Sequence, residues 1–206
     1  MTESHATFSA GGLQLAGLIA LPEPRCAGAA VVCHPHPMYG GSMHNNVVEA
    51  VLEALWSRGY ATLRFNFRGV DGSEGEYDGG EGELDDARAA VQFLAAKTGG
   101  GTVTLAGYSF GASVALRSGL ADPSVERVIA VALPVAVMRT AISIATKPVL
   151  LISGDRDSYS PLEPLRAVAN DLGASARVEV VAGADHFFAG SETSLSAIVA
   201  GALANH

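Results

Sequence analysis

Apolar and polar positions along this chain form blocks that predict strands followed by helices. A short, continuous apolar run at residues 29–33 is typical of a strand buried on both faces of a sheet, and further strands are predicted at residues 61–67, 102–106, 127–133 and 148–152. A further strand is expected at residues 177–181. Apolar residues recur at helical spacing or form helix-like runs at residues 44–58, 83–97, 112–117, 161–172 and 194–203.

Strands that alternate with helices predict right-handed βαβ units, and therefore an α/β fold with a mostly parallel sheet covered by helices on both faces. Near the start, residues 7–10 and 13–21 predict a hairpin. The helix over residues 44–58 is expected to take Ser42 as its N-cap and to end at Gly59. A length of 206 residues, without an internal repeat or a low-complexity linker, fits a single domain over residues 1–206.

Composition narrows the classes of partner. The net charge of -8, without a basic cluster, argues against nucleic acid and against anionic membrane surfaces as partners. Two cysteines, Cys26 and Cys33, are too few for a disulfide framework. We see no signal peptide in residues 1–12 and no apolar run long enough to span a bilayer, so a cytoplasmic location is expected.

The pentapeptide Gly107-Tyr108-Ser109-Phe110-Gly111 is the most informative stretch for function. The pattern G-x-S-x-G has chemical meaning where a strand turns sharply into a helix, and here it joins the runs 102–106 and 112–117. Its glycines suit a strained turn in which a Cβ would crowd the neighbouring backbone. The free N–H groups of the following helix favour negative charge beside Ser109. We therefore take Ser109 as a candidate nucleophile.

A serine hydroxyl needs a base within hydrogen-bond reach, and the base needs an orienting acid. Active sites of such sheets lie beyond the carboxyl ends of the strands. His186, directly after the strand at 177–181, is the predicted base. Asp157 follows the strand at 148–152 and is the predicted acid, because the loop must first turn at Gly154. Asp155 in the same loop is the alternative acid, or else a brace for the loop.

A tetrahedral intermediate also needs two N–H donors for its oxyanion. One is expected from Phe110, the residue after the nucleophile. The other is expected from the loop 34–41, which contains Pro35 and Pro37 and is therefore stiff. Since proline has no N–H, His36 is the predicted donor and Met38 the alternative.

The other polar clusters give weaker indications of a functional site. His34, His36 and His44 do not combine with a carboxylate or cysteine at a familiar ligand spacing, so no metal is predicted. His34 is expected to hold its loop through buried hydrogen bonds. The acidic segment 71–86 is expected to be a solvated loop and a helix N-terminus, with Arg68 as a candidate ion-pair partner.

Taken together, these segments resemble the small α/β-hydrolases, and more narrowly a compact bacterial group within them. The resemblance covers nearly the whole chain. It rests on G-x-S-x-G at Ser109, His34-Pro35-His36-Pro37 followed by Gly40-Gly41, Arg64-Phe65-Asn66-Phe67-Arg68-Gly69-Val70, Gly154-x-x-Asp157 and Asp185-His186. It implies a mainly parallel eight-stranded sheet, a Ser-His-Asp acyl-transfer mechanism and no organic cofactor. Asp71 stands where many relatives are expected to have glycine, which bears on the following loop.

Many members of this superfamily insert a helical lid before the strand at 148–152, but residues 134–147 are too few for a cap domain. The sequence therefore predicts an open, shallow pocket for small or flexible esters. Its expected lining is Met38, Tyr39, Tyr108, Phe110, Pro134, Met138, Tyr159 and Phe187.

The resulting hypothesis is a cytoplasmic serine hydrolase, a carboxylesterase acting on a small-molecule ester. Acyl transfer to another acceptor, or thioester or amide cleavage, would use the same residues. A non-catalytic binding protein on a hydrolase scaffold is an alternative of another class. The oligomeric state stays open, with a homodimer through an apolar patch around Met138 as one alternative.

Overall fold

The computed structural model describes residues 1–23, 25–137 and 144–204. In these residues one eight-stranded sheet runs in the order β1-β2-β4-β3-β5-β6-β7-β8. The strands are β1 Ser4–Ala10, β2 Leu13–Ala20, β3 Gly28–Cys33, β4 Tyr60–Phe65, β5 Val103–Tyr108, β6 Val125–Val131, β7 Val149–Gly154 and β8 Ala176–Val181. The pairs β1–β2 and β2–β4 are antiparallel, and all pairs from β4 to β8 are parallel. The predicted α/β fold with a mostly parallel sheet is confirmed.

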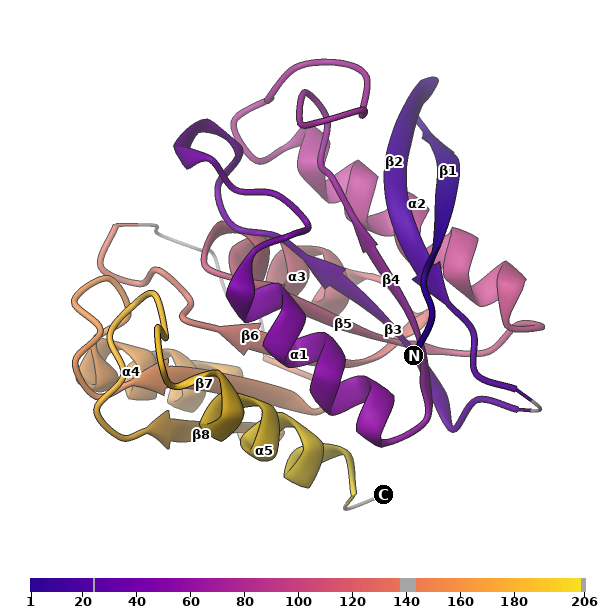
Figure 1. Cartoon of the computed structure of the whole chain (residues 1–206). Coiled ribbons are helices and arrows are strands. Elements are labelled where there is room, and N and C mark those ends of the chain that lie inside the picture. Colours follow the sequence, from indigo (N-terminus) through magenta and orange to yellow (C-terminus); the bar gives the residue numbers. More distant parts are fainter. Residues whose placement is uncertain (24, 138–143, 205–206) are drawn as a thin grey trace.

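Helices cover both faces of the sheet (Figure 1). They are α1 Asn46–Ser57, α2 Gly82–Lys97, α3 Phe110–Ala121, α4 Leu162–Leu172 and α5 Glu192–Leu203, with a short 3-10 helix η1 at Pro37–Tyr39. Helices α1 and α5 pack side by side on one face, and α2, α3 and α4 pack on the other, each group with its own apolar core. The central strands are buried on both faces, which is why their sequences are apolar without alternation.

The start of α1 differs from the prediction. Asn45 is the N-cap, because its side-chain oxygen accepts a hydrogen bond from the N–H of Val47 at 2.9 Å. Ser42 instead accepts from the N–H of His44 at 3.4 Å, and its carbonyl accepts from the N–H of Asn45. The chain therefore makes one extra turn before the helix, and the predicted cap at Ser42 is wrong.

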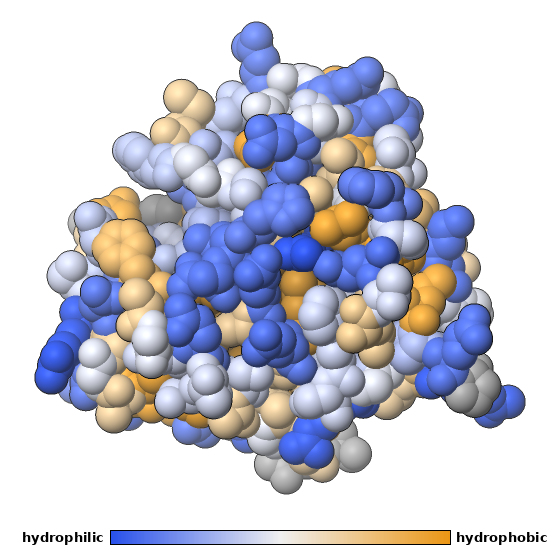
Figure 2. All heavy atoms as spheres, viewed as in Figure 1, coloured by the Kyte–Doolittle hydropathy of each residue, from blue (hydrophilic) through white to orange (hydrophobic). Residues whose placement is uncertain are grey.

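The outer surface of the α1 and α5 layer is mostly hydrophilic, with separate small hydrophobic patches (Figure 2). One patch lies at the left edge of that view, beside the loops that follow the carboxyl ends of the strands (Figures 1 and 2). Within the described residues, no helix has the length and apolarity needed to cross a membrane.

The parallel strands place the carboxyl ends of β3, β5, β7 and β8 at the same end of the sheet, so that the loops after them meet. The connection from β6 to β7 has only residues 132–148 and is too short for a cap domain. Met138, predicted for the pocket lining and for a subunit contact, lies outside the described residues.

Candidate active site

Ser109 sits in a strained turn between β5 and α3. Its backbone has φ 54° and ψ -115°, a conformation that side-chain-bearing residues rarely adopt. A Cβ added at Gly107 would lie 2.1 Å from the carbonyl oxygen of Gly111, and one added at Gly111 would lie 2.4 Å from that of Cys33. Both glycines are therefore required for the close approach of α3 to β5 and β3. This approach presents Ser109 at the end of the sheet.

Three predicted side chains from three loops form one continuous hydrogen-bonded row. The Oγ of Ser109 lies 3.0 Å from Nε2 of His186, and Nδ1 of His186 lies 2.9 Å from Oδ2 of Asp157. When the serine hydroxyl donates to Nε2, Nδ1 carries the ring proton and donates it to the carboxylate. His186 is 9% exposed and Asp157 4% exposed, so the base and the acid are shielded from bulk water, while Ser109 is half-buried. This is the geometry of a nucleophile, a base and an orienting acid.

The two candidate acids have different surroundings. Oδ1 of Asp157 accepts hydrogen bonds from the N–H groups of Tyr159 and Ser160, at 2.8 and 2.9 Å, so its carboxylate is held facing His186. Asp155 instead accepts from the N–H of Gly183 at 2.7 Å and braces the loop that carries the histidine. The structure therefore brings Asp157, and not Asp155, to His186.

Backbone contact between the acid loop and the histidine loop sets their distance. A Cβ added at Gly154 would lie 2.1 Å from the carbonyl oxygen of Ala184. The same carbonyl accepts a hydrogen bond from the N–H of Arg156 at 3.0 Å. Only glycine at position 154 permits this approach, which lets Asp157 and His186 meet.

Tyr108 has a different position from the one predicted. It was expected in the substrate wall, but it is 3% exposed, and its hydroxyl donates to the carbonyl oxygen of His186 at 2.9 Å. Burial, together with the charges of Asp157 and Asp185, raises the pKa of this phenol, so the hydroxyl stays a donor at neutral pH. Pro134, also predicted in the wall, is buried. Tyr108 thus positions the histidine loop, a role that no local pattern in the sequence indicates.

The loop after β3 lies against the amino end of α3. The ring centroids of His36 and Phe110 are 4.9 Å apart. Nδ1 of His36 accepts from the N–H of Met38 at 3.2 Å, which leaves the ring proton on Nε2, 3.2 Å from the hydroxyl of Tyr77. The N–H of Met38, the alternative oxyanion donor, is therefore already paired. Among the described residues, the N–H groups of His36 and Phe110 donate to no acceptor within the chain.

His34 holds this loop from inside the protein. It is fully buried, its Nε2 accepts from the N–H of Phe67 at 3.0 Å, and its Nδ1 lies 2.6 Å from the carbonyl oxygen of Pro35. The accepted hydrogen bond requires a neutral ring with the proton on Nδ1. Burial lowers the pKa of His34 to about 4, against the opposing effects of the Pro35 carbonyl and Asp71. The expectation that His34 secures the loop by buried hydrogen bonds is confirmed.

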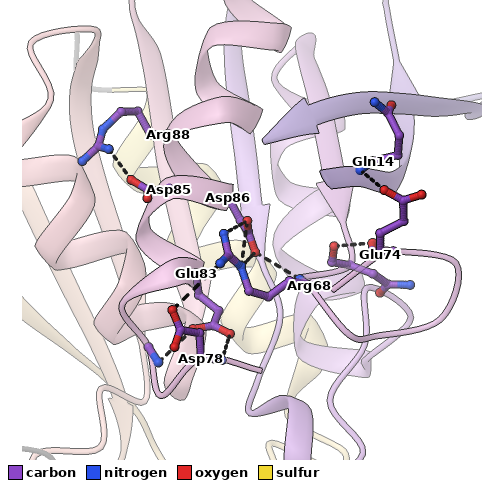
Figure 3. A network of polar contacts seen from close by, with 11 residues as sticks. Gln14, Arg68, Glu74, Asp78, Glu83, Asp85, Asp86 and Arg88 are labelled. Atoms are coloured by element: carbon purple, nitrogen blue, oxygen red, sulfur yellow. Dashed lines mark hydrogen bonds and ion pairs between the residues drawn. The ribbon is translucent and has the colours of Figure 1, made fainter. Parts of the chain in front are cut away.

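The acidic segment is more ordered than expected (Figure 3). Asp86 is fully buried and pairs with Arg68, whose Nη2 lies 2.7 Å from Oδ1. Glu83 is also fully buried, and its two oxygens accept from the N–H groups of Asp78 and Gly80 at 3.0 and 2.8 Å. The predicted acidic helix N-terminus and the ion pair of Arg68 are confirmed, whereas Glu83 and Asp86 are buried and not solvated. These carboxylates organise the loop next to Tyr77 and hence next to His36.

The rim around Ser109 is aromatic and open. Met38, Tyr39, Tyr159 and Phe187 are 66%, 86%, 45% and 61% exposed, respectively. The rings of Tyr159 and Phe187 lie 4.7 and 5.7 Å from that of His186, and the ring of Tyr39 lies 4.8 Å from that of His36. The side chain of Phe110, predicted for the pocket lining, is instead buried in the core. Within the described residues, no group of three or more His, Cys, Asp or Glu side chains could hold a metal ion.

Comparison with known proteins identifies the family. Residues 29–198 match the alpha/beta hydrolase domain. An alpha-beta serine hydrolase homologue from Coxiella burnetii is 34% identical, with a TM-score of 0.91 over 98% of both chains. XC6422 from Xanthomonas campestris, described as a serine hydrolase without lid, is 33% identical, with a TM-score of 0.85 over 97% of this chain and 92% of that one.

Among curated proteins, the uncharacterized protein RP471 of Rickettsia prowazekii (strain Madrid E) is 34% identical in a 169-residue alignment that covers 77% of this chain and 71% of the relative. The domain match extends over most of the chain, from β3 into α5. It covers the turn at Ser109 and the loops of Asp157 and His186. The chain therefore belongs to the alpha/beta hydrolase family.

Proposed function

We propose that the protein is a serine hydrolase that cleaves small carboxylic esters through an acyl-enzyme. The observation that carries the proposal is the hydrogen-bonded row of Ser109, His186 and Asp157, at 3.0 and 2.9 Å. Two N–H groups also support it: those of Phe110, the residue after Ser109, and of His36, whose ring lies 4.9 Å from that of Phe110, have no acceptor within the described chain.

The chemistry follows from these positions. The Oγ of Ser109 forms a bond to the ester carbonyl carbon while its proton passes to Nε2 of His186. The carbonyl oxygen takes the negative charge and accepts hydrogen bonds from the N–H groups of Phe110 and His36. The ester C–O bond then breaks, and the alcohol leaves with the proton from His186. Water attacks the acyl-enzyme by the same steps, which releases the acid and restores Ser109.

The open rim supports hydrolysis of small or flexible esters. Tyr39, Tyr159 and Phe187 expose their rings on either side of the site and can contact an acyl chain without enclosing it. Water can reach an acyl-enzyme at such a site, which favours hydrolysis over transfer to another acceptor. An apolar surface of this kind discriminates weakly, by about 1–3 kcal/mol per methylene at most even in a closed pocket. We therefore expect a gradual dependence on acyl length.

The test combines active-site labelling with a series of p-nitrophenyl esters of increasing acyl length. A fluorophosphonate probe should label Ser109, and Ser109→Ala should lower turnover by on the order of 10⁶. Ser124→Ala, a change before β6 at the other end of the sheet, is the matched control and should keep full activity. Failure of the probe to label Ser109 in folded protein would favour a binding protein on this scaffold. Ester products formed with added alcohols would favour an acyltransferase.

A further inference from the structure

A basic groove lies at the amino ends of the parallel strands, at the opposite end of the sheet from Ser109. It consists of a cavity of about 550 Å³ lined by Arg58, Arg127, Tyr60 and Glu126 among others, and a neighbouring one of about 180 Å³ that shares Arg127 and adds Arg177. Helices α1 and α5 end beside it, at the lower right of Figure 1. The larger cavity is of a size that holds small molecules.

Arg127, on β6, is the unusual side chain of the basic groove. It is only 7% exposed, yet its Nε and Nη1 atoms are buried without a hydrogen-bond partner. It is the one arginine among the described residues with buried, unpaired guanidinium nitrogens. Buried donors without an acceptor are destabilising and rare in folded proteins, so bound water or a ligand has to supply the missing acceptors.

Two further residues that line the basic groove are positively charged, like Arg127. Arg58 and Arg177 also line the groove, and none of these three arginines forms an ion pair with any described residue. Glu126 is the one carboxylate among the lining residues, and its oxygens accept from the hydroxyls of Thr102 and Thr104. Arg58 and Arg177 are exposed, so among the three it is Arg127 whose charge is buried without an ion pair.

The carboxyl end of α5 lies beside these charges. Nε of Arg58 donates to the carbonyl oxygen of Ala200 in the last turn of α5 at 2.9 Å. Leu203 and Ala204, at the carboxyl end of the same helix, line the larger cavity. The partial negative charge at this helix end offsets some of the repulsion between the guanidinium groups. It supplies no acceptor to Arg127.

We propose that the basic groove binds a multivalent oxyanion, a small molecule bearing a phosphate group or several carboxylates. Arg127 is the central residue that binds this anion. Nε and Nη1 border different edges of the planar guanidinium, so pairing both takes oxygen atoms in more than one position. Arg58 and Arg177 supply the further positive charge that such an anion requires. The site is independent of the proposed ester hydrolysis.

The test is calorimetric titration of the full chain with inorganic phosphate and, separately, with citrate, at constant ionic strength. We expect saturable binding of at least one anion with a Kd of about 1 mM or lower. The anion that binds more tightly shows whether the site prefers phosphate or carboxylate groups. Arg127→Met should weaken binding by at least about tenfold, and Arg177→Gln by less. Arg88→Gln, at an exposed ion pair on α2, is the control and should bind as wild type does.

Stability measurements separate binding from a structural role. In anion-free buffer, Arg127→Met should unfold at the same or a higher temperature than wild type, because it removes unpaired buried donors. Ser109→Ala should bind the anion with unchanged affinity. The proposal is overturned if neither anion binds wild type below about 10 mM, if Arg127→Met binds equally well, or if this variant is less stable without anion. Failure of Arg127→Met to fold would count as lower stability and would overturn the proposal in the same way.

Discussion

Acid should destabilise this protein through one buried imidazole, that of His34. Its pKa is about 4 in the folded chain, against 6.5 for an ordinary histidine, and burial is the main cause. As the pH falls from about 6.5 to about 4, the unfolded chain takes up a proton that the folded chain does not, so the free energy of unfolding decreases. The shift corresponds to roughly 3 kcal/mol in full, and to about 2 kcal/mol at pH 5. This stability is fully present above the unfolded pKa.

The assay is urea unfolding of wild type and of His34→Gln at about pH 7.5 and about pH 5. Glutamine can accept from the N–H of Phe67 and donate to the carbonyl of Pro35, but it does not titrate. On going to the lower pH, wild type should lose about 2 kcal/mol more than the variant does.

His44→Gln removes an exposed histidine and is expected to follow wild type. Parallel losses in wild type and His34→Gln would refute the reasoning. They would mean that His34 is protonated in the folded protein as readily as in the unfolded one, and that the hydrogen bond from Phe67 does not hold the ring neutral.

Three further predictions concern the site and its support. Asp157→Asn should lower turnover by on the order of 10⁴ by disturbing the histidine tautomer, whereas Asp155→Asn should keep most activity; the reverse order in an ester assay would assign the acid to Asp155. Gly154→Ala should lose activity and unfold at a lower temperature, because its Cβ would lie 2.1 Å from the carbonyl oxygen of Ala184; an unchanged melting temperature and turnover would contradict the contact. Asp86→Asn should destabilise the fold by roughly 3–5 kcal/mol in urea unfolding, since it removes one partner of a buried ion pair, and a loss below about 1 kcal/mol would show the pair to be solvated.

Local patterns were sufficient for the elements and for part of the site. The turn at Ser109 could be predicted because its causes are local: two glycines, a strand before and a helix after. Asp157 could be preferred over Asp155 because the loop has to turn at Gly154. The cap at Asn45 was missed, since Ser42 and Asn45 are both good caps and only the path of the chain selects between them. The buried state of Glu83 and Asp86 was missed because an acidic run has no signal for partners elsewhere in the fold.

By itself, the sequence determined the alternation of strands and helices, the mostly parallel sheet and the edge at which the chemically capable loops meet. These follow from short-range periodicity and from the fact that parallel strands end together. Tertiary structure decided the rest. The packing of Gly154 on Ala184 sets the distance between the acid and the histidine. Tyr108 is buried, so it positions the histidine loop and does not line the pocket. The basic groove joins Arg58, Arg127 and Arg177, which lie far apart along the chain, so its charge is visible only once the strands are side by side.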